Sequence, residues 1–209
     1  MSIDRDLFNR QIWGAQSRFE LLLRGHLWVE HFLEKMLVLV FKRPESVALD
    51  RLTWTHKLGL CDGLDLVTPW EATALSEMNR IRNRLAHDLT SEPSDDDIAA
   101  LLKLSPPNVL AAVDAVRKVE KKGDRLGGDE SLSDLRFWLL VLAMDLDYRV
   151  ETQEYEKTHE TSLWRAMGLK VSLDMTGKPI TQEEAEKREG LPPRPQPGAS
   201  FRPPKEIEN

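Results

Sequence analysis

The sequence contains one cysteine, Cys61, among its 209 residues. A single cysteine excludes an intramolecular disulfide framework and a cysteine-based zinc cluster, and it is typical of a reducing compartment. Long apolar runs are also missing, because the longest covers only the eight residues 137–144, whereas a helix that crosses a bilayer needs about 20. Charged residues stand at the amino terminus, where a signal peptide needs an apolar run. We therefore expect a cytoplasmic protein without a membrane-spanning segment.

An excess of positive charge is absent as well. Lysine and arginine together number 29 against 35 aspartates and glutamates, which gives a formal net charge of −6. This balance excludes a generally basic protein that coats nucleic acid, although a local basic site remains open. The apolar content of 41% is high enough for a packed core, and the sequence shows no internal repeat.

Apolar residues recur at helical spacing along most of the chain, and no segment alternates as a strand does. The longest amphipathic stretch predicts a helix over 17–42. Thr68-Pro69-Trp70-Glu71 has the pattern of a capping box with proline in the first turn, and it begins a predicted helix that continues to about Asp88. Further helices are expected over 4–13, 52–60, 94–104, 106–122 and, capped by Ser131 or Ser133, up to about Lys157. The predicted fold class is all-α, an antiparallel bundle.

Proline divides the chain into two regions, because six of the twelve prolines lie between residues 192 and 204. We expect a helical domain over 1–157, with its core from about residue 17, and a carboxy-terminal extension over 158–209. Leu163, Trp164 and Met167 are candidates to dock a short helix on the bundle. The proline-rich stretch from about residue 190 predicts a disordered tail.

Polar and basic residues crowd the predicted end of the helix that begins near Thr68. Residues 79–88 read Asn-Arg-Ile-Arg-Asn-Arg-Leu-Ala-His-Asp. Three arginines within five residues make this segment the main local positive charge in an acidic chain, and a weaker one lies over 117–125. The candidate site residues of this segment are Asn79, Arg80, Arg82, Asn83, Arg84 and His87.

The segment from Arg82 to His87 resembles the arginine–polar–x–x–x–histidine motif of HEPN domains. Its position late on a helix, after a long first helix and a short second one, is also similar to that family over residues 17–89. The order of segments, with 93–98 after the motif helix, resembles the mannitol-repressor group within the superfamily. The resemblance implies four to five bundled helices, a homodimer and, in active members of toxin or antiviral-defence type, RNA cleavage without metal or cofactor. On this basis the catalytic candidates are Arg82, Asn83 and His87, and the substrate-binding candidates are Asn79, Arg80 and Arg84.

The chemistry of these side chains fits such a reaction. Attack by a neighbouring 2′-hydroxyl needs a proton acceptor and donor near neutral pH, which histidine supplies, and a fixed cation for the phosphate oxygens, which arginine supplies. Five helical positions correspond to about 500°, so Arg82 and His87 point about 140° apart on one straight helix. A site therefore requires a distorted helix end or two helices that meet across a two-fold axis. The polar, small-residue face formed by Asn79, Arg82, Asn83 and Ala86 is a candidate for that isologous interface.

Other interpretations remain open from the sequence. The motif can simply end a helix, with His87 near the negative end of the dipole and Arg84 paired with Asp88. We interpret His26 and His31 as core-edge or surface residues, because metal ligands on a helix favour spacings of three or four positions. A second candidate function is a non-catalytic regulator, similar to the mannitol repressor, that binds a protein partner such as an antitoxin. A third is nucleotide binding without turnover.

Overall fold

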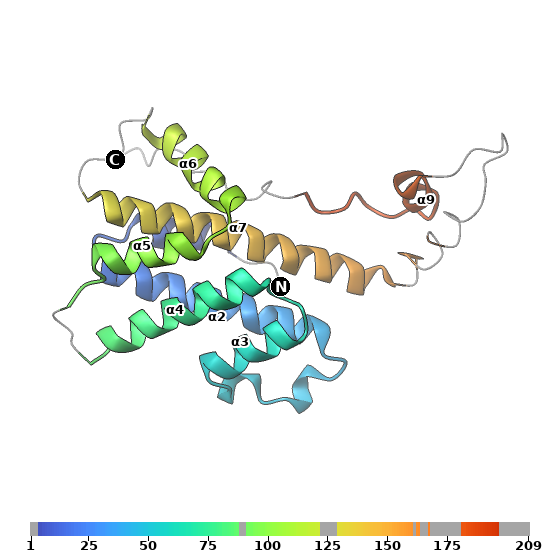
Figure 1. Ribbon diagram of the computed structural model, residues 1–209. Helices are drawn as coiled ribbons and strands as arrows, with labels where there is room; N and C mark the ends of the chain where they lie inside the picture. The colour runs from blue at the N-terminus through green and yellow to red at the C-terminus, as the bar shows by residue number, and fades with distance from the viewer. Residues whose placement is uncertain are drawn as a thin grey trace.

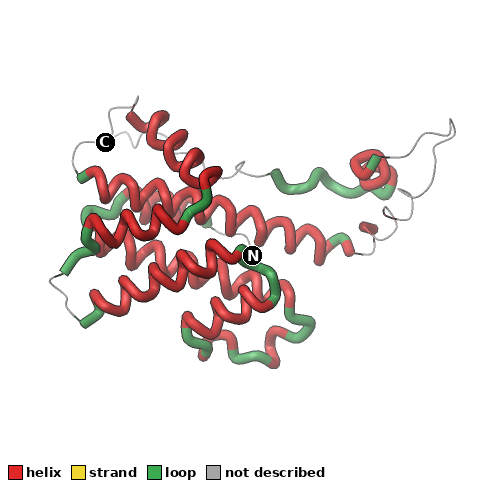
Figure 2. Tube along the Cα trace, viewed as in Figure 1, coloured by secondary structure: helices red, strands yellow, loops and turns green. Residues whose placement is uncertain are grey.

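The computed structural model describes residues 4–87, 91–121, 129–160, 162–163, 167 and 181–196 of the chain. These residues form helices joined by loops, with no β-strand among them (Figure 1, Figure 2), so the all-α prediction is confirmed. Within the described ranges, no helix is long and apolar enough to span a membrane. The α-helices are α1 (Arg5–Trp13), α2 (Arg18–Val40), α3 (Trp54–Gly63), α4 (Pro69–Leu85), α5 (Asp95–Leu104), α6 (Pro107–Lys121), α7 (Glu130–Thr158) and α9 (Gln182–Arg188). Two 3₁₀ turns, η1 (Pro44–Ser46) and η2 (Leu49–Arg51), lie between α2 and α3.

The hydrophobic core is centred on the two long helices α2 and α7, and α1, α3, α4 and α5 pack around them (Figure 1). Gly25 of α2 lies directly against α7, because a Cβ atom added to it would come within 2.6 Å of a methyl carbon of Leu139. A larger residue at this position would force the Leu139 side chain to shift. The predicted apolar stripe of the last bundle helix is buried as expected, and it consists of Leu135, Leu139, Leu142 and Leu146.

The directions of the helices differ in one pair from the antiparallel arrangement that we expect. Arg18 at the start of α2 pairs with Asp129 at the start of α7, and Lys157 near the end of α7 donates a 2.8 Å hydrogen bond to the carbonyl of Leu39 near the end of α2. These contacts show that α2 and α7 run parallel. Helix α4 runs antiparallel to both. In the sequence, α3 to α6 come between α2 and α7. They bring the chain back to the end of the bundle at which α2 begins, and α7 starts from that end.

Helix α4, which carries the motif, begins as predicted. The Glu71 carboxylate accepts hydrogen bonds of 2.6 Å from both the backbone N–H and the hydroxyl of Thr68, which completes the capping box. The helix ends at Leu85 rather than near Asp88, and residues 88–90 lie outside the described part of the chain. Its core face is buried and comprises Ala74, Leu75, Met78, Ile81 and Leu85.

The amino-terminal cap of α7 corrects one prediction. Asp129, and neither Ser131 nor Ser133, caps the helix, because its carboxylate accepts from the backbone N–H groups of Ser131 and Leu132 at 3.0 and 3.2 Å. The Ser131 hydroxyl donates instead to Asp95 of α5 at 2.6 Å. The N-cap of α7 is therefore an aspartate that precedes both serines, and neither of the two serines that the sequence suggested occupies this position.

The carboxy-terminal extension has more defined contacts than its composition predicts. Residues 182–188 form helix α9, which has its own capping box, and the segment after it runs back along the carboxy-terminal half of α7 (Figure 1). The Tyr155 hydroxyl donates a 2.8 Å hydrogen bond to the Pro192 carbonyl. Of the tail that is predicted to be disordered from about residue 190, residues 190–196 are described, and 197–209 lie outside the described residues. Of the three candidate docking residues, Leu163 is half-buried, Met167 is exposed and Trp164 lies outside the described residues.

Candidate functional site

The motif residues lie at the carboxy-terminal end of α4, which packs against α2 and α5. In Figure 1 this end lies on the opposite side of the molecule from α9. The core face of α4 points inward, so the polar residues lie on the remaining surface of the last turns. Asn79 and Arg82 are half-buried at the edge of the core, and Asn83 is exposed. The structure therefore presents the motif at the surface, in the place that the capped helix predicts.

Two of the three arginines already have carboxylate partners. Arg80 binds Glu77 with both Nε and Nη2, at 2.7 and 2.6 Å, and this hydrogen bonding lowers the pKa of the Glu77 carboxyl. Arg84 pairs at 2.5 Å with Asp97 of α5, and Asp88, the partner considered from the sequence, lies outside the described residues. Burial opposes ionisation of Asp97, but hydrogen bonds from Arg84 and Ser94 hold its pKa below the usual range. Much of the local positive charge is therefore compensated within the chain.

Arg82 is different, because the described part of the chain provides no carboxylate partner for it. Its Nη1 donates a 3.0 Å hydrogen bond to Oδ1 of the neighbouring Asn83. Asn79, Arg82, Asn83 and Ala86 follow one another at spacings of three, one and three positions, so their side chains share one face of α4. This face combines an uncompensated guanidinium with two amides, a donor set that suits a phosphate group.

His87 lies just beyond the helix. The backbone N–H of Ala86 still bonds to the Arg82 carbonyl at 3.0 Å, whereas the N–H of His87 bonds to the Arg84 carbonyl at 3.3 Å, which closes a tighter turn. The His87 side chain is exposed, and no hydrogen bond joins its ring to Arg82 or Asn83 in the described chain. The structure thus brings Asn79, Arg82 and Asn83 onto one face but does not by itself bring His87 to Arg82 within one protomer.

His26, which the sequence predicts at the core edge or on the surface, contacts the motif helix, and the sequence did not predict this contact. His26 of α2 is only 5% exposed, its Nε2 lies 3.1 Å from Oδ1 of Asn79, and its ring stacks on Trp54 of α3 with centroids 3.8 Å apart. Burial lowers the pKa of His26, and the positive charge of Arg82 lowers it further. A signal was present in the sequence, because position 26 falls on the apolar stripe of α2 between Leu22 and Val29.

Two buried nitrogens beside this contact have no hydrogen-bond partner in the described chain, Nδ1 of His26 and Nε1 of Trp54. Both atoms lie beside the motif helix, because Asn79 of α4 contacts the other ring nitrogen of His26.

Comparison with known proteins gives no family. No family model, no curated protein and no solved structure matches this chain. The HEPN resemblance therefore rests on the residues of the motif helix and on the order of the helices. No group of three or more histidine, cysteine, aspartate or glutamate side chains that could hold a metal ion occurs among the residues that the structure describes.

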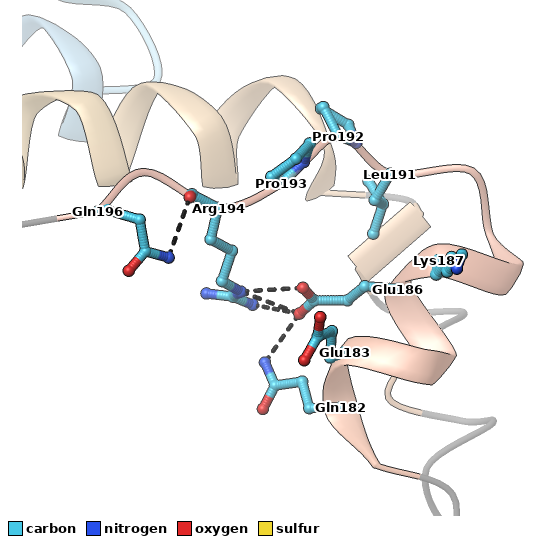
Figure 3. Close-up of a pocket in the computed structure, with 9 residues that line it drawn as sticks. All are labelled: Gln182, Glu183, Glu186, Lys187, Leu191, Pro192, Pro193, Arg194 and Gln196. Carbon is cyan, nitrogen blue, oxygen red and sulfur yellow. Dashed lines mark hydrogen bonds and ion pairs between the residues drawn. The ribbon is translucent and has the colours of Figure 1, made fainter. Parts of the chain in front are cut away.

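A cleft of about 680 Å³ lies away from the motif, between α9 and the segment that follows it (Figure 3). Two of its charged residues are paired with each other, because Arg194 binds both carboxylate oxygens of Glu186 at 2.7 to 3.1 Å, and Gln182 donates to the same carboxylate at 2.8 Å. The Arg194 guanidinium also lies 5.7 Å above the Tyr155 ring. Glu183 and Lys187 line the cleft as well, but its lining contains neither a histidine nor the motif, so the motif end of α4 remains the stronger candidate site.

Proposed function

We propose that this protein is a HEPN-type endoribonuclease of toxin or defence type, which cleaves RNA without a metal ion at a site shared by two protomers. The observation that carries the proposal is Arg82, a guanidinium without a carboxylate partner in the described part of the chain, on an amide-bearing face of α4, with the exposed His87 five residues further along the chain. Arg82 stabilises the charge that develops on the phosphate, and His87 takes the proton from the attacking 2′-hydroxyl or gives one to the leaving oxygen. Asn83 orients the Arg82 guanidinium through their hydrogen bond.

A shared site follows from the position of His87. Because Arg82 and His87 do not meet within one protomer, a two-fold axis near the Asn79–Ala86 face supplies the missing neighbour from a second copy. Arg80 and Arg84 lie beside this face and contribute less, since each must first release a carboxylate before it can bind a phosphate. The homodimer is therefore part of the proposed mechanism.

The experiment that tests this mechanism uses mixed dimers. Arg82→Ala and His87→Ala should each lower the rate of single-stranded RNA cleavage, measured with EDTA present, by at least about 100-fold, the usual contribution of such groups. Arg80→Ala, a matched control on the same helix, should lower it only a few-fold, about the effect of a surface ion pair. Random mixing of the two inactive variants should restore about a quarter of the wild-type rate, because half of the dimers then contain one intact shared site.

Two results would contradict the mechanism. Full cleavage by the His87→Ala variant would remove the proposed acid–base group. Inactive single variants whose mixture stays inactive, although exchange of protomers is shown by mass spectrometry, would place the whole site within one protomer.

A non-catalytic regulator is the second candidate, and the ion pairs of Arg80 and Arg84 favour it, because a site that spends two of its three cations within the chain binds RNA less strongly. In this case the motif face would contact a protein partner. Co-purification of a stable partner that is lost in Arg82→Ala, together with no cleavage at any protein concentration, would support the regulator over the nuclease.

A further inference from the structure

His26 is held from three sides in the interior of the bundle. Its own helix α2 carries it on the core face, the Trp54 ring of α3 stacks on it with an angle of 22° between the ring planes, and Asn79 of α4 lies 3.1 Å from its Nε2. The side chain is 5% exposed, so it cannot contact a macromolecular substrate directly. The direct contact of His26 with the α4 site is its contact with Asn79.

The contact with Asn79 fixes the tautomer of the ring. The partner atom is the carboxamide oxygen, which can only accept, so Nε2 carries a proton and donates it. Burial first and the charge of Arg82 second keep the pKa of His26 low, while the Asn79 bond and the carboxylate of Glu30 act in the opposite direction. Glu30 is itself bound by the buried ammonium of Lys57 at 2.7 Å. The ring is therefore neutral at neutral pH, with the lone pair on Nδ1.

The same hydrogen bond fixes the Asn79 amide. The oxygen and the nitrogen of a carboxamide lie on opposite branches of one planar group, so an oxygen held by His26 directs Nδ2 away from the buried ring. Asn79 is half-buried and precedes Arg82 by three positions, which makes the two side chains neighbours on the helix surface. An oriented amide N–H₂ beside a guanidinium without a carboxylate partner is a donor set that matches the oxygens of a phosphodiester.

We infer that His26 is a positioning residue of the α4 site, which holds the Asn79 amide so that its N–H groups and the Arg82 guanidinium bind one phosphodiester together. His26 does not touch the substrate. The inference rests on the proposed function for the class of substrate, but it requires only that the site binds a phosphodiester, whether or not cleavage follows.

The test measures binding of an oligonucleotide that cannot react. Full-length protein is titrated into a fluorescent single-stranded oligodeoxynucleotide, which lacks the 2′-hydroxyl, and anisotropy gives the Kd. His26→Phe keeps an aromatic ring against Trp54 but removes the N–H donor, whereas His26→Gln keeps a donor near the position of Nε2. We expect the Phe variant to bind about tenfold more weakly, as for the loss of one oriented hydrogen bond, and the Gln variant to bind within about threefold of wild type.

A double-mutant cycle separates positioning from a general loss of structure. Asn79→Ala should weaken binding by the same factor as His26→Phe, and the combined variant should bind no more weakly than either single variant, since both changes remove one interaction. His31→Phe is the matched control, because His31 lies on the same helix and contacts Trp28 rather than α4. It should leave the Kd unchanged. ¹⁵N NMR of the wild-type protein should show His26 protonated on Nε2 alone.

Each outcome decides one of the two claims. Binding and a coupled cycle without any RNA cleavage by the wild-type protein would reject the ribonuclease and keep the inference. Cleavage by the wild-type protein, with equal binding by wild type and His26→Phe, would keep the ribonuclease and overturn the inference. Losses that multiply in the double variant, an Nδ1–H tautomer, or no saturable binding by the wild-type protein would also overturn it.

Discussion

The two ends of helix α4 use charged residues in opposite ways. At the amino-terminal end, the Glu71 side chain is fully buried and is bonded by Thr68, and Arg149 of α7 lies 3.2 Å from its carboxylate. At the carboxy-terminal end, Arg82 is half-exposed and has no carboxylate partner among the described residues, and His87 is exposed. The difference lies in burial, which makes one end an element of the fold and leaves the other available to a ligand.

This comparison shows why a charge count is a poor guide to a site. The buried carboxylate and its arginine have fixed partners, so they hold α4 against α7 and cannot serve a substrate without unfolding part of the bundle. Removal of a partner at the amino-terminal end should therefore lower stability, whereas removal of a group at the motif end should lower binding and activity and leave stability nearly unchanged.

The largest effect on stability is expected from Arg149→Met. The substitution keeps the length of the side chain but leaves Glu71 without its cation and the carbonyl of Leu66 without a donor at 3.2 Å. At pH 8, where Glu71 is ionised, we expect the free energy of unfolding, measured with urea, to fall by about 3 kcal/mol, the usual cost of breaking a buried pair. Arg80→Met, which breaks an exposed pair at the motif end, should lower it by about 0.5 kcal/mol or less. Equal losses in the two variants would remove the distinction between the ends.

The dependence of stability on pH should also differ between the ends. Burial and the neighbouring carboxyl of Asp145 raise the pKa of Glu71 to about 7, against 4.5 in an unfolded chain. The folded state then binds more protons than the unfolded state between these values, so the contribution of Glu71 is present below pH 4.5 and is lost as the pH rises to about 7. The loss is on the order of 3 kcal/mol. In Glu71→Gln, urea unfolding at pH 5 and pH 8 should no longer show this decrease.

His26, beside the motif end of α4, should make stability depend on pH in the opposite direction. Its pKa is lowered from 6.5 by burial and by Arg82, so the unfolded state binds more protons, and stability is present above pH 6.5 and lost as the pH falls. His26→Gln should remove this loss on the acid side and leave the decrease caused by Glu71 intact. The contrary result would be a stability that rises from pH 5 to pH 8 by the same amount in the wild-type protein and in Glu71→Gln. It would show that Glu71 ionises normally.

The sequence predicted the helices well because their ends are encoded locally. Thr68 with Glu71 and Ser94 with Asp97 form the expected caps, and the apolar spacing placed the core faces. The all-α class follows from those two signals alone. Helix α9 was missed because it has almost no apolar face, and it is held instead by the cap of Thr181 and by contacts with the segment after it.

The candidate site was only half predictable. The motif and its place at the surface could be read from residues close together in the chain, and so could the pair of Arg80 with Glu77, three positions away. The partner of Arg84, thirteen positions further on, and the contact of Asn79 with His26, across 53 positions, depend on how α4 packs against α5 and α2. Helical periodicity carries no information about such pairs.

The smallest of the stability effects compares two capping boxes of the same type. Thr68 caps α4 inside the bundle, and Thr181 caps α9 in the extension, and each threonine is bonded by the glutamate three residues later. Loss of such a cap costs about 1 kcal/mol in a helix that unfolds with the whole domain. Thr68→Ala should therefore lower the free energy of global unfolding by about this amount, whereas Thr181→Ala should change it by no more than about 0.3 kcal/mol, because α9 lies outside the core and can open on its own.

Urea unfolding followed by tryptophan fluorescence gives the global value, and hydrogen exchange of the α9 amides should show the local opening that Thr181→Ala increases. A loss of about 1 kcal/mol in both variants would mean that the extension unfolds together with the bundle and belongs to the same cooperative unit.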